Sequence, residues 1–308
     1  MTDGTLWILT GPTASGKSGL ALELAQRRDC EIVCMDSMQI YRGMDIGTAK
    51  PTAREQALVP HHMLDVCDPR EAYSVVQWVE DALGCIRDIH SRGRRAMLVG
   101  GTGFYLRALR HPMAMGQTPG DPAIRARLTA EAEEPGGKEK LHAALAACDP
   151  ETAGRLHPND VRRVVRALEV WEVTGTPFSR QLQRDEPPPF PSRCVCLTLP
   201  RERLYERINT RVEQMMAQGL AEEVRTLLEA GVPENSQAMQ GIGYKEMIPC
   251  VRGLCTAREA GETIAQNTRH YAKRQMTWFR GEKDMAWLEA DAPDALKRLE
   301  DSLLGGEA

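Results

Sequence analysis

Residues 6–18 of the chain read LWILTGPTASGKS. The apolar run at 6–9 is typical of a buried strand, and apolar residues at helical spacing follow from residue 20. The segment between them matches the phosphate-loop pattern G-x-x-x-x-G-K-[ST]. The matching residues are Gly11, Pro12, Thr13, Ala14, Ser15, Gly16, Lys17 and Ser18. Because the pattern lies between a strand and a helix, we interpret it as a phosphate-binding loop and not as an accidental glycine-rich turn.

The residue types of this loop indicate what it binds. Glycines let successive backbone N–H groups turn toward phosphate oxygens, and the N-terminus of the following helix adds a partial positive charge. Lys17 can reach the outer phosphate, and the Ser18 hydroxyl can help to hold Mg²⁺. The sequence therefore predicts a site for a di- or triphosphate, with Mg²⁺ as the cofactor.

Three further segments read as buried strands, at residues 31–35, 96–99 and 193–199. They alternate with helical stretches, which predicts an α/β fold with a parallel sheet like that of phosphate-loop NTPases. Ligands of such sheets gather at the carboxyl ends of the strands. Asp36 and the glycine-rich turn at 100–103 fall at that edge.

The strand at 96–99 ends in glycines and not in the acidic residue that organises Mg²⁺ and water in many NTPases. Asp36 is the only acid at a strand end near the phosphate loop. A lone aspartate at such a place is often an N-cap or turn residue. Its position beside the loop equally fits a functional carboxylate, and the residues alone leave both interpretations open.

The composition changes after residue 113 and indicates an inserted domain. Helical spacing recurs in it over residues 123–134, 138–147 and 161–173. A proline-rich connector at 187–191 then leads back toward the core. We expect a phosphate-loop core at 1–113 and 190–308, helical in its C-terminal part, and an all-helical insertion at 114–189.

The 308 residues are 42% hydrophobic and 27% charged, which excludes fibrous and wholly disordered classes. Nine cysteines without paired two-residue spacing indicate reduced thiols and not a zinc site. His61 and His62 lack the acid or cysteine spacing of a metal site and are expected to be structural. The chain starts without a secretory signal and contains no apolar run long enough to cross a membrane, so we expect a soluble cytoplasmic protein.

The net charge of −4 argues only weakly against a nucleic-acid partner, because it averages over the whole surface. Residues 155–166 carry +3 and residues 269–283 carry +4, whereas residues 284–308 carry −5. A solvated helix face is the alternative interpretation of the first basic stretch. Aromatic residues within the second could stack on bases, although we expect Trp278 and Phe279 to belong to the core.

Several motifs together resemble the tRNA dimethylallyltransferase (tRNA isopentenyltransferase) family in its bacterial form. The most specific is DSMQIYRGMDIGTAKP at 36–51. The others are the phosphate loop at 11–18, HH at 61–62, VGGTG at 99–103, GIGYKE at 241–246 and TRHYAKRQ at 268–275. The motifs span nearly the whole chain.

The resemblance implies transfer of a dimethylallyl group from dimethylallyl diphosphate to N6 of the adenosine 3′-adjacent to the anticodon. The substrates would be tRNAs that read codons starting with U, and the product N6-isopentenyladenosine. The implied partners are the tRNA anticodon stem-loop and dimethylallyl diphosphate, and we expect a monomer. Such a reaction breaks a carbon–oxygen bond and activates no water, which explains the missing acid of the NTPases.

Matched residue by residue, the resemblance makes Asp36 the general base for the exocyclic amine. It places Thr13 and Thr102 in the same cavity, orienting Asp36, the target base or the diphosphate, and Arg211 against the diphosphate. The implied tRNA contacts are Asp36, Ser37, Met38, Gln39, Thr102, Arg125, Arg162, Arg163, Val164, Val165 and Arg166.

Three other classes of protein share parts of this pattern. A phosphate-loop kinase of small molecules shares the strand, loop and helix but explains neither the helical insertion nor the basic stretches. An adenylate dimethylallyltransferase shares the core chemistry but is shorter and lacks an insertion as large as 114–190. A non-catalytic RNA-binding protein needs neither a complete phosphate loop nor Asp36.

Overall fold

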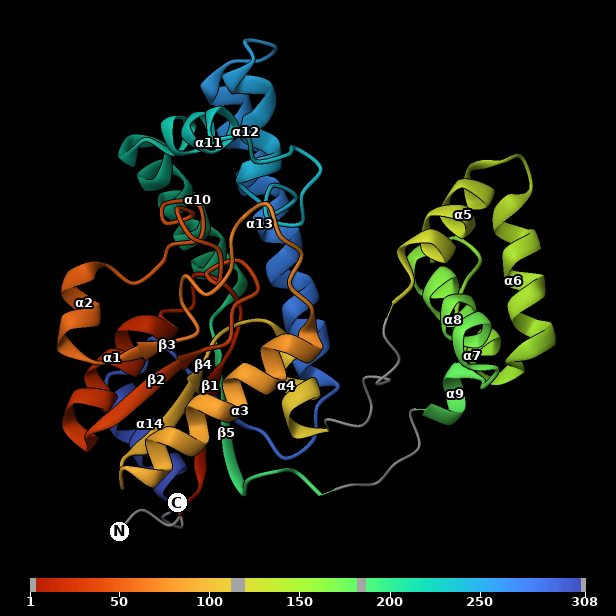
Figure 1. The fold of residues 1–308 in the computed structure, drawn as a ribbon. Helices are drawn as coiled ribbons and strands as arrows, with labels where there is room; N and C mark the ends of the chain where they lie inside the picture. Colours follow the sequence, from red (N-terminus) through yellow and green to blue (C-terminus); the bar gives the residue numbers. More distant parts are fainter. Residues whose placement is uncertain (1–3, 112–119, 182–186, 306–308) are drawn as a thin grey trace. The chain divides into compact units, whose positions relative to one another are not determined.

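A computed structural model describes residues 4–111, 120–181 and 187–305 (Figure 1). The strands of these residues form one sheet, in which every neighbouring pair is parallel and the order is β3-β2-β4-β1-β5-β6. The strands are β1 (Leu6–Thr10), β2 (Cys30–Cys34), β3 (His61–His62), β4 (Arg95–Val99), β5 (Ser192–Thr198) and β6 (Ala286–Glu289). The predicted α/β fold with a parallel sheet is confirmed.

Helices cover both faces of this sheet, so the central strands are buried. Helix α1 (Lys17–Arg28) and helix α14 (Ala295–Leu304) contact each other on one face, and α3 (Val75–Ser91) lies on the other (Figure 1). Short helices α2 (Ala53–Leu58) and α4 (Gly103–Arg110) follow β2 and β4. The carboxyl ends of β1, β2 and β4 therefore meet at one edge of the sheet.

Two strands lack a sequence signal. Strand β3 has only two residues, and three of the four residues of β6 are exposed because it is an edge strand. Neither contains the run of buried apolar residues from which the other strands were predicted. Strand β6 thus interrupts the C-terminal part that the sequence predicted to be mostly helical.

Four helices after β5 pack on one another and extend away from the sheet (Figure 1). They are α10 (Arg201–Gln218), α11 (Leu220–Glu229), α12 (Tyr244–Val251) and α13 (Ala257–Arg280). The Thr256 side chain and Glu259 form a capping box that begins α13, the longest of them. The far end of α13 returns to the sheet, where Gln275 reaches the loops after β1 and β4.

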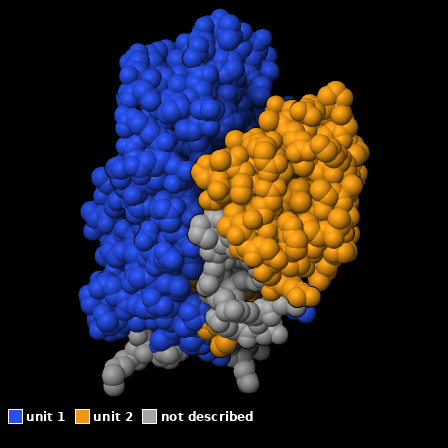
Figure 2. Space-filling view, turned by 45° about the vertical axis from the view of Figure 1, so that its right-hand side comes forward, with its two compact units in different colours: residues 1–106, 189–308 blue, residues 107–188 orange. Residues whose placement is uncertain are grey.

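The chain divides into two compact units, coloured separately in Figure 2. Unit 1 contains residues 1–106 and 189–308, and unit 2 contains residues 107–188. The start of the insertion predicted at residue 114 lies outside the described residues. None of the helices in the described parts of either unit is long and apolar enough to span a membrane.

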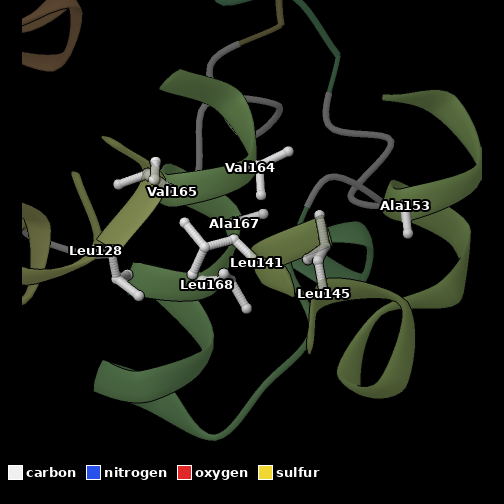
Figure 3. Packing of buried hydrophobic residues seen from close by; sticks show 9 residues of the cluster. Leu128, Leu141, Leu145, Ala153, Val164, Val165, Ala167 and Leu168 are labelled. Carbon is white, nitrogen blue, oxygen red and sulfur yellow. The ribbon is translucent and has the colours of Figure 1, made fainter. Parts of the chain in front are cut away.

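Unit 2 is built from helices around its own apolar core (Figure 3). They are α5 (Pro122–Glu133), α6 (Gly137–Cys148), α7 (Pro150–Arg155), α8 (Val161–Thr174) and α9 (Phe178–Gln181). Asp121 caps α5 by accepting hydrogen bonds from the N–H groups of Ala123 and Ile124. The core residues are Leu128, Ala132, Leu141, Leu145, Ala153, Val164, Val165, Ala167 and Leu168.

A buried carboxylate on β2 joins the sheet to the end of α3. Glu31 accepts hydrogen bonds from Arg92 at 2.9 Å and Arg94 at 3.1 Å and lies 2.7 Å from Nε2 of His62. Pairing of β2 with β3 supplies the acid beside His62 that the sequence alone did not reveal. Within the described ranges, histidines, cysteines and acids form no cluster that could hold a metal ion.

We expect Glu31→Gln to lower the free energy of unfolding by about 3 kcal/mol at neutral pH, because it leaves the arginines without their buried charge partner. Hydrogen bonds from Arg92 and His62 hold the pKa of Glu31 at about 2, against burial, which raises it. Because the pKa of Glu31 is depressed in the folded state, its ionised carboxylate stabilises the fold at pH values above the ordinary glutamate pKa. This stabilisation is lost as the pH falls from about 4 to 2.

Urea unfolding at pH 7 and pH 3 measures both effects of Glu31→Gln. Glu23→Gln is the matched control, since Glu23 pairs with Arg27 on an exposed face of α1, where ion pairs contribute less than about 1 kcal/mol. An equal decrease in the free energy of unfolding in Glu31→Gln and Glu23→Gln would contradict the prediction.

Candidate active site

The phosphate loop connects β1 to α1 through a backbone that only glycine adopts readily. Gly11 has φ 139° and Gly16 has φ 92°. A Cβ on Gly11 would lie 2.8 Å from the carbonyl oxygen of Leu197 on β5. The glycines therefore let the loop lie close against the sheet before the chain enters α1, and the N-terminus of a helix favours an anion.

Lys17, the first residue of α1, folds back over this loop. Its Nζ donates to the carbonyl oxygens of Gly11 at 2.9 Å and Pro12 at 2.7 Å. Burial, together with the nearby charge of Arg211, lowers the pKa of Lys17 to about 7. A half-buried cation that can exchange two carbonyl partners for phosphate oxygens is suited to hold an anionic ligand.

Asp36 follows β2 and lines the same cavity as Lys17. Its Oδ1 accepts hydrogen bonds from the backbone N–H groups of Met38 at 2.8 Å and Gln39 at 3.3 Å. Burial raises the pKa of the Asp36 carboxyl, although these N–H groups and the Lys17 charge act in the opposite direction. Asp36 thus has a turn role, since one of its oxygens closes the turn, and it also lines a cavity beside the phosphate loop.

Thr102, in the turn after β4, holds the segment that carries Asp36. Its Oγ1 accepts from the N–H of Ser37 at 3.2 Å, and its own N–H donates to the carbonyl oxygen of Met35 at 3.3 Å. A Cβ on Gly100 would lie 2.0 Å from that same carbonyl oxygen, so the glycine allows the two strand ends to meet. Thr102 therefore orients Asp36 through the backbone.

Gln275 on α13 connects the two loops that flank Asp36, a role the sequence did not reveal. Its Oε1 accepts from the N–H of Thr13 at 2.9 Å, and its Nε2 donates to the carbonyl oxygen of Gly101 at 2.8 Å. Gln275 is buried and lines the cavity beside Tyr271. Its place in the motif at 268–275 is the only sequence signal that points to it.

The cavity has a volume of about 100 Å³ and one acidic residue, Asp36, among the described residues that line it. Its cationic groups are Lys17 and Arg211 of α10, whose pKa burial lowers. The other lining residues are Thr13, Ala14, Ser15, Gly16, Ser18, Ala21, Ile32, Cys34, Gln39, Thr48, Ala49, Pro51, His61, Val99, Gly100, Gly101, Tyr271 and Gln275. Thr102 lies next to this wall, and so all four residues predicted to be catalytic come together here.

The tRNA contacts predicted in unit 2 fall into three groups. Arg125 and Arg166 both pair with the buried Glu169, at 3.0 and 2.7 Å, and Arg163 pairs with Asp160 at 3.0 Å. The exposed Arg162 has no ion-pair partner among the described residues. The structure corrects the prediction for the side chains of Val164 and Val165: they lie in the core of the unit, 1% and 3% exposed, and cannot reach an RNA (Figure 3).

The second basic stretch forms the end of α13 in unit 1. Phe279 is fully buried, as predicted. The prediction that Trp278 is a core residue is wrong, because its side chain is only half-buried and lines a surface hollow. The hollow is formed by His270, Lys273, Arg274, Thr277 and Trp278. A partly exposed ring beside two cations is the arrangement that stacks on nucleic-acid bases.

Fold and site together define a phosphate-loop protein in which, among the described residues, one half-buried carboxylate lines the cavity beside the loop. The chain matches the family model described as IPP transferase over residues 39–282 and the one described as isopentenyl transferase over residues 4–65. This chain belongs to the IPP transferase family.

Relatives cover nearly its full length. It is 50% identical over 286 residues to the tRNA dimethylallyltransferase of Geobacter metallireducens, covering 92% of each chain. It is 45% identical over 301 residues to the tRNA dimethylallyltransferase of Shouchella clausii, covering 98% of this chain and 96% of the other. The resemblance seen in the motifs is thereby confirmed.

Comparison with solved structures supports the same family assignment. A tRNA isopentenylpyrophosphate transferase from Bacillus halodurans matches with a TM-score of 0.73 and 40% identity, covering 98% of this chain and 96% of that one. A eukaryotic dimethylallyltransferase acting on tRNA matches with a TM-score of 0.84 and 28% identity, covering 99% and 81% of the two chains. The fold is therefore shared over the whole length of this chain.

Proposed function

We propose that this protein transfers the dimethylallyl group of dimethylallyl diphosphate to N6 of the adenosine 3′-adjacent to the anticodon. Its substrates are tRNAs that read codons starting with U, and its product is N6-isopentenyladenosine. The observation that carries the proposal is the single cavity that joins the phosphate loop and Lys17 to one carboxylate, Asp36. Membership of the IPP transferase family supports the same reaction.

The chemistry follows from what each side of the cavity offers. The N6 lone pair forms a bond to C1 of the dimethylallyl group, and the C1–O bond breaks so that the diphosphate leaves with the electron pair. Lys17, Arg211 and the loop N–H groups stabilise the charge that grows on the diphosphate. Asp36 takes the proton that N6 loses, because a carboxylate whose pKa is raised by burial is a better base than a fully solvated one.

Mg²⁺ fits the same cavity. The ion is commonly held by few protein ligands together with phosphate oxygens and waters, and the exposed Ser18 hydroxyl lines the cavity at the start of α1. When bound there, Mg²⁺ would supply positive charge to the leaving diphosphate. Ser18 and the phosphate loop would hold it with the substrate.

The target base must leave its stack to reach a cavity of this size. Bases of a single-stranded loop are splayed out more readily than bases of a duplex, which favours an anticodon loop. The hollow at the end of α13 and the exposed Arg162 of unit 2 are the cationic surfaces that we assign to the RNA. We further propose that the protein acts in the cytoplasm and as a monomer.

A prenylation assay tests the proposal. The protein is incubated with Mg²⁺, dimethylallyl diphosphate and unmodified tRNA whose anticodon ends in adenosine, and the digested RNA is searched for prenylated adenosine by mass spectrometry. The same tRNA with guanosine in place of the target adenosine is the control. Prenylation of free AMP and not of tRNA would favour the adenylate enzyme, and ATP turnover on a small acceptor without prenylation would favour a kinase.

We expect Arg162→Ala to weaken tRNA binding and to make the plot of log K against log salt shallower by about 0.7 to 0.9, the value for one lost phosphate contact. Arg162 is exposed and unpaired among the described residues, so it is free to meet a phosphate. Binding measured over a range of salt concentrations gives the slope.

Arg127→Ala is the control for Arg162→Ala. It changes the net charge of unit 2 by the same amount, but Arg127 already pairs with Glu172 and Glu131. An unchanged slope for Arg162→Ala would mean that this end of α8 does not touch the RNA.

A further inference from the structure

One carboxylate on α11 binds a loop that begins far from it in the sequence. Oε2 of Glu223 accepts from the N–H groups of Asp45 at 3.0 Å and Ile46 at 2.7 Å. Its Oε1 accepts from the N–H of Gly47 at 3.1 Å and from the Tyr244 hydroxyl at 2.6 Å. Three consecutive backbone donors and a phenol thus surround a single anion, an arrangement known from anion-binding nests.

The loop is also packed closely against the ring of Tyr244. A Cβ on Gly47 would lie 2.5 Å from Cε2 of that ring, so only glycine lets the backbone approach it. The ring is fully buried beneath the loop. Glu223 of α11 and Tyr244 of α12 therefore fix residues 45–47, and we call these two side chains the loop clamp.

The residues after the clamped segment form part of the wall of the active-site cavity. Thr48, Ala49 and Pro51 all line it together with Asp36. Nε2 of Gln39 donates to the carbonyl oxygens of Thr48 at 3.1 Å and Ala49 at 3.2 Å. The wall is thus supported by Gln39 on the side of Asp36 and by the loop clamp on the side of α11.

Asp36 does not depend on the loop clamp in the same way. Its oxygen is held by the N–H groups of Met38 and Gln39, and its backbone neighbours are held by Thr102. A loosened wall can therefore leave the base in place. When the wall is loosened, the loop must be ordered each time substrate binds, which costs conformational entropy. This free-energy cost applies to the bound ground state and to the transition state alike.

We propose that Glu223, together with Tyr244, is a positioning residue that holds residues 45–49 as a preformed wall for the bound prenyl diphosphate. The inference rests on the proposed function for the identity of the ligand. Hydrogen exchange of the ligand-free protein does not depend on that function, so the inference about the loop and the proposed function can fail separately.

The test compares Glu223→Ala with wild type in the prenylation assay. We expect KM for dimethylallyl diphosphate to rise about 10-fold while kcat changes less than about 3-fold, as for the loss of an interaction that acts on both states equally. Glu223→Gln retains one oxygen and is expected to recover part of the loss. Glu222→Ala is the control, because Glu222 lies beside it on α11 and, among the residues that the structure describes, forms an ion pair with the exposed Arg225 alone.

Amide exchange in the absence of substrate supplies the independent measurement. The N–H groups of Asp45, Ile46 and Gly47 should exchange faster in Glu223→Ala than in wild type, and at the wild-type rate in Glu222→Ala. If Glu223→Ala does not fold, Tyr244→Phe keeps the ring, removes the hydroxyl with its hydrogen bonds to Glu223 and the Gly47 backbone, and should raise KM about 2- to 3-fold.

Each outcome decides one point. Wild-type exchange and wild-type KM in Glu223→Ala would overturn the loop clamp, and so would a fall in kcat alone, which indicates a smaller folded fraction. A wild-type protein that does not prenylate tRNA would overturn the proposed function, while faster exchange in Glu223→Ala would still support the clamp.

Discussion

Replacing Asp36 by asparagine is expected to lower kcat for prenyl transfer by about 10²- to 10⁴-fold, the range for loss of a general base. The carboxamide oxygen can still accept from the N–H groups of Met38 and Gln39, so the turn keeps its shape. The amide can no longer take the proton from N6. The rate of prenylated adenosine formation at saturating substrates measures the loss.

The affinity for tRNA and the pH profile show whether Asp36 acts through the proton. Binding of tRNA should stay close to wild type, because the substitution removes no cation. Burial raises the pKa of Asp36, and a protonated carboxyl cannot accept a proton, so wild-type kcat/KM should fall as the pH falls through that pKa. Asp36→Asn should lack this acid limb. A rate near that of wild type would refute the role of base.

The parts of the fold that could be predicted from the sequence have local causes. Strand β1, the phosphate loop and α1 follow one another within the chain, and the buried runs of β2, β4 and β5 are visible without knowledge of their neighbours. The position of Asp36 at the cavity follows from the same reasoning, since the carboxyl ends of parallel strands share an edge.

The parts that could not be predicted depend on residues that meet only in the folded chain. Gln275 and Gly101 are 174 positions apart, and Glu223 and Asp45 are 178 apart. No local pattern marks a glutamine or glutamate as the partner of a distant backbone group. The motif at 268–275 includes Gln275, whereas Glu223 lies in none of the motifs, and the physical role of each appears only when α11 and α13 pack beside the loops.

Charge patterns gave incomplete information for a related reason. In the basic segment of α8, the valines between the arginines serve the core, and Arg125 and Arg166 neutralise Glu169. Only the contacts of each side chain separate a cation that is free to bind RNA from one that satisfies a buried acid.

Lys17→Met is expected to lower kcat/KM for dimethylallyl diphosphate by about 10²- to 10³-fold, as for the removal of one donor to a developing anion. Methionine fills the half-buried site of Lys17 without leaving an unpaired charge, so thermal unfolding should be little changed. Lys297→Met on the exposed face of α14 is the matched control and should behave like wild type. Equal kinetics in the two variants would exclude Lys17 from the diphosphate site.

The pH dependence of substrate binding provides a second test of Lys17. Because its pKa in the ligand-free protein is about 7, the charged fraction falls as the pH rises above that value. The affinity of wild type for the diphosphate should therefore decrease above about pH 7, since only the protonated amine donates three hydrogen bonds and carries a charge. Lys17→Met should bind the diphosphate weakly, and its affinity should not decrease above pH 7. If the affinity of the variant still decreases there, another group causes the pH dependence.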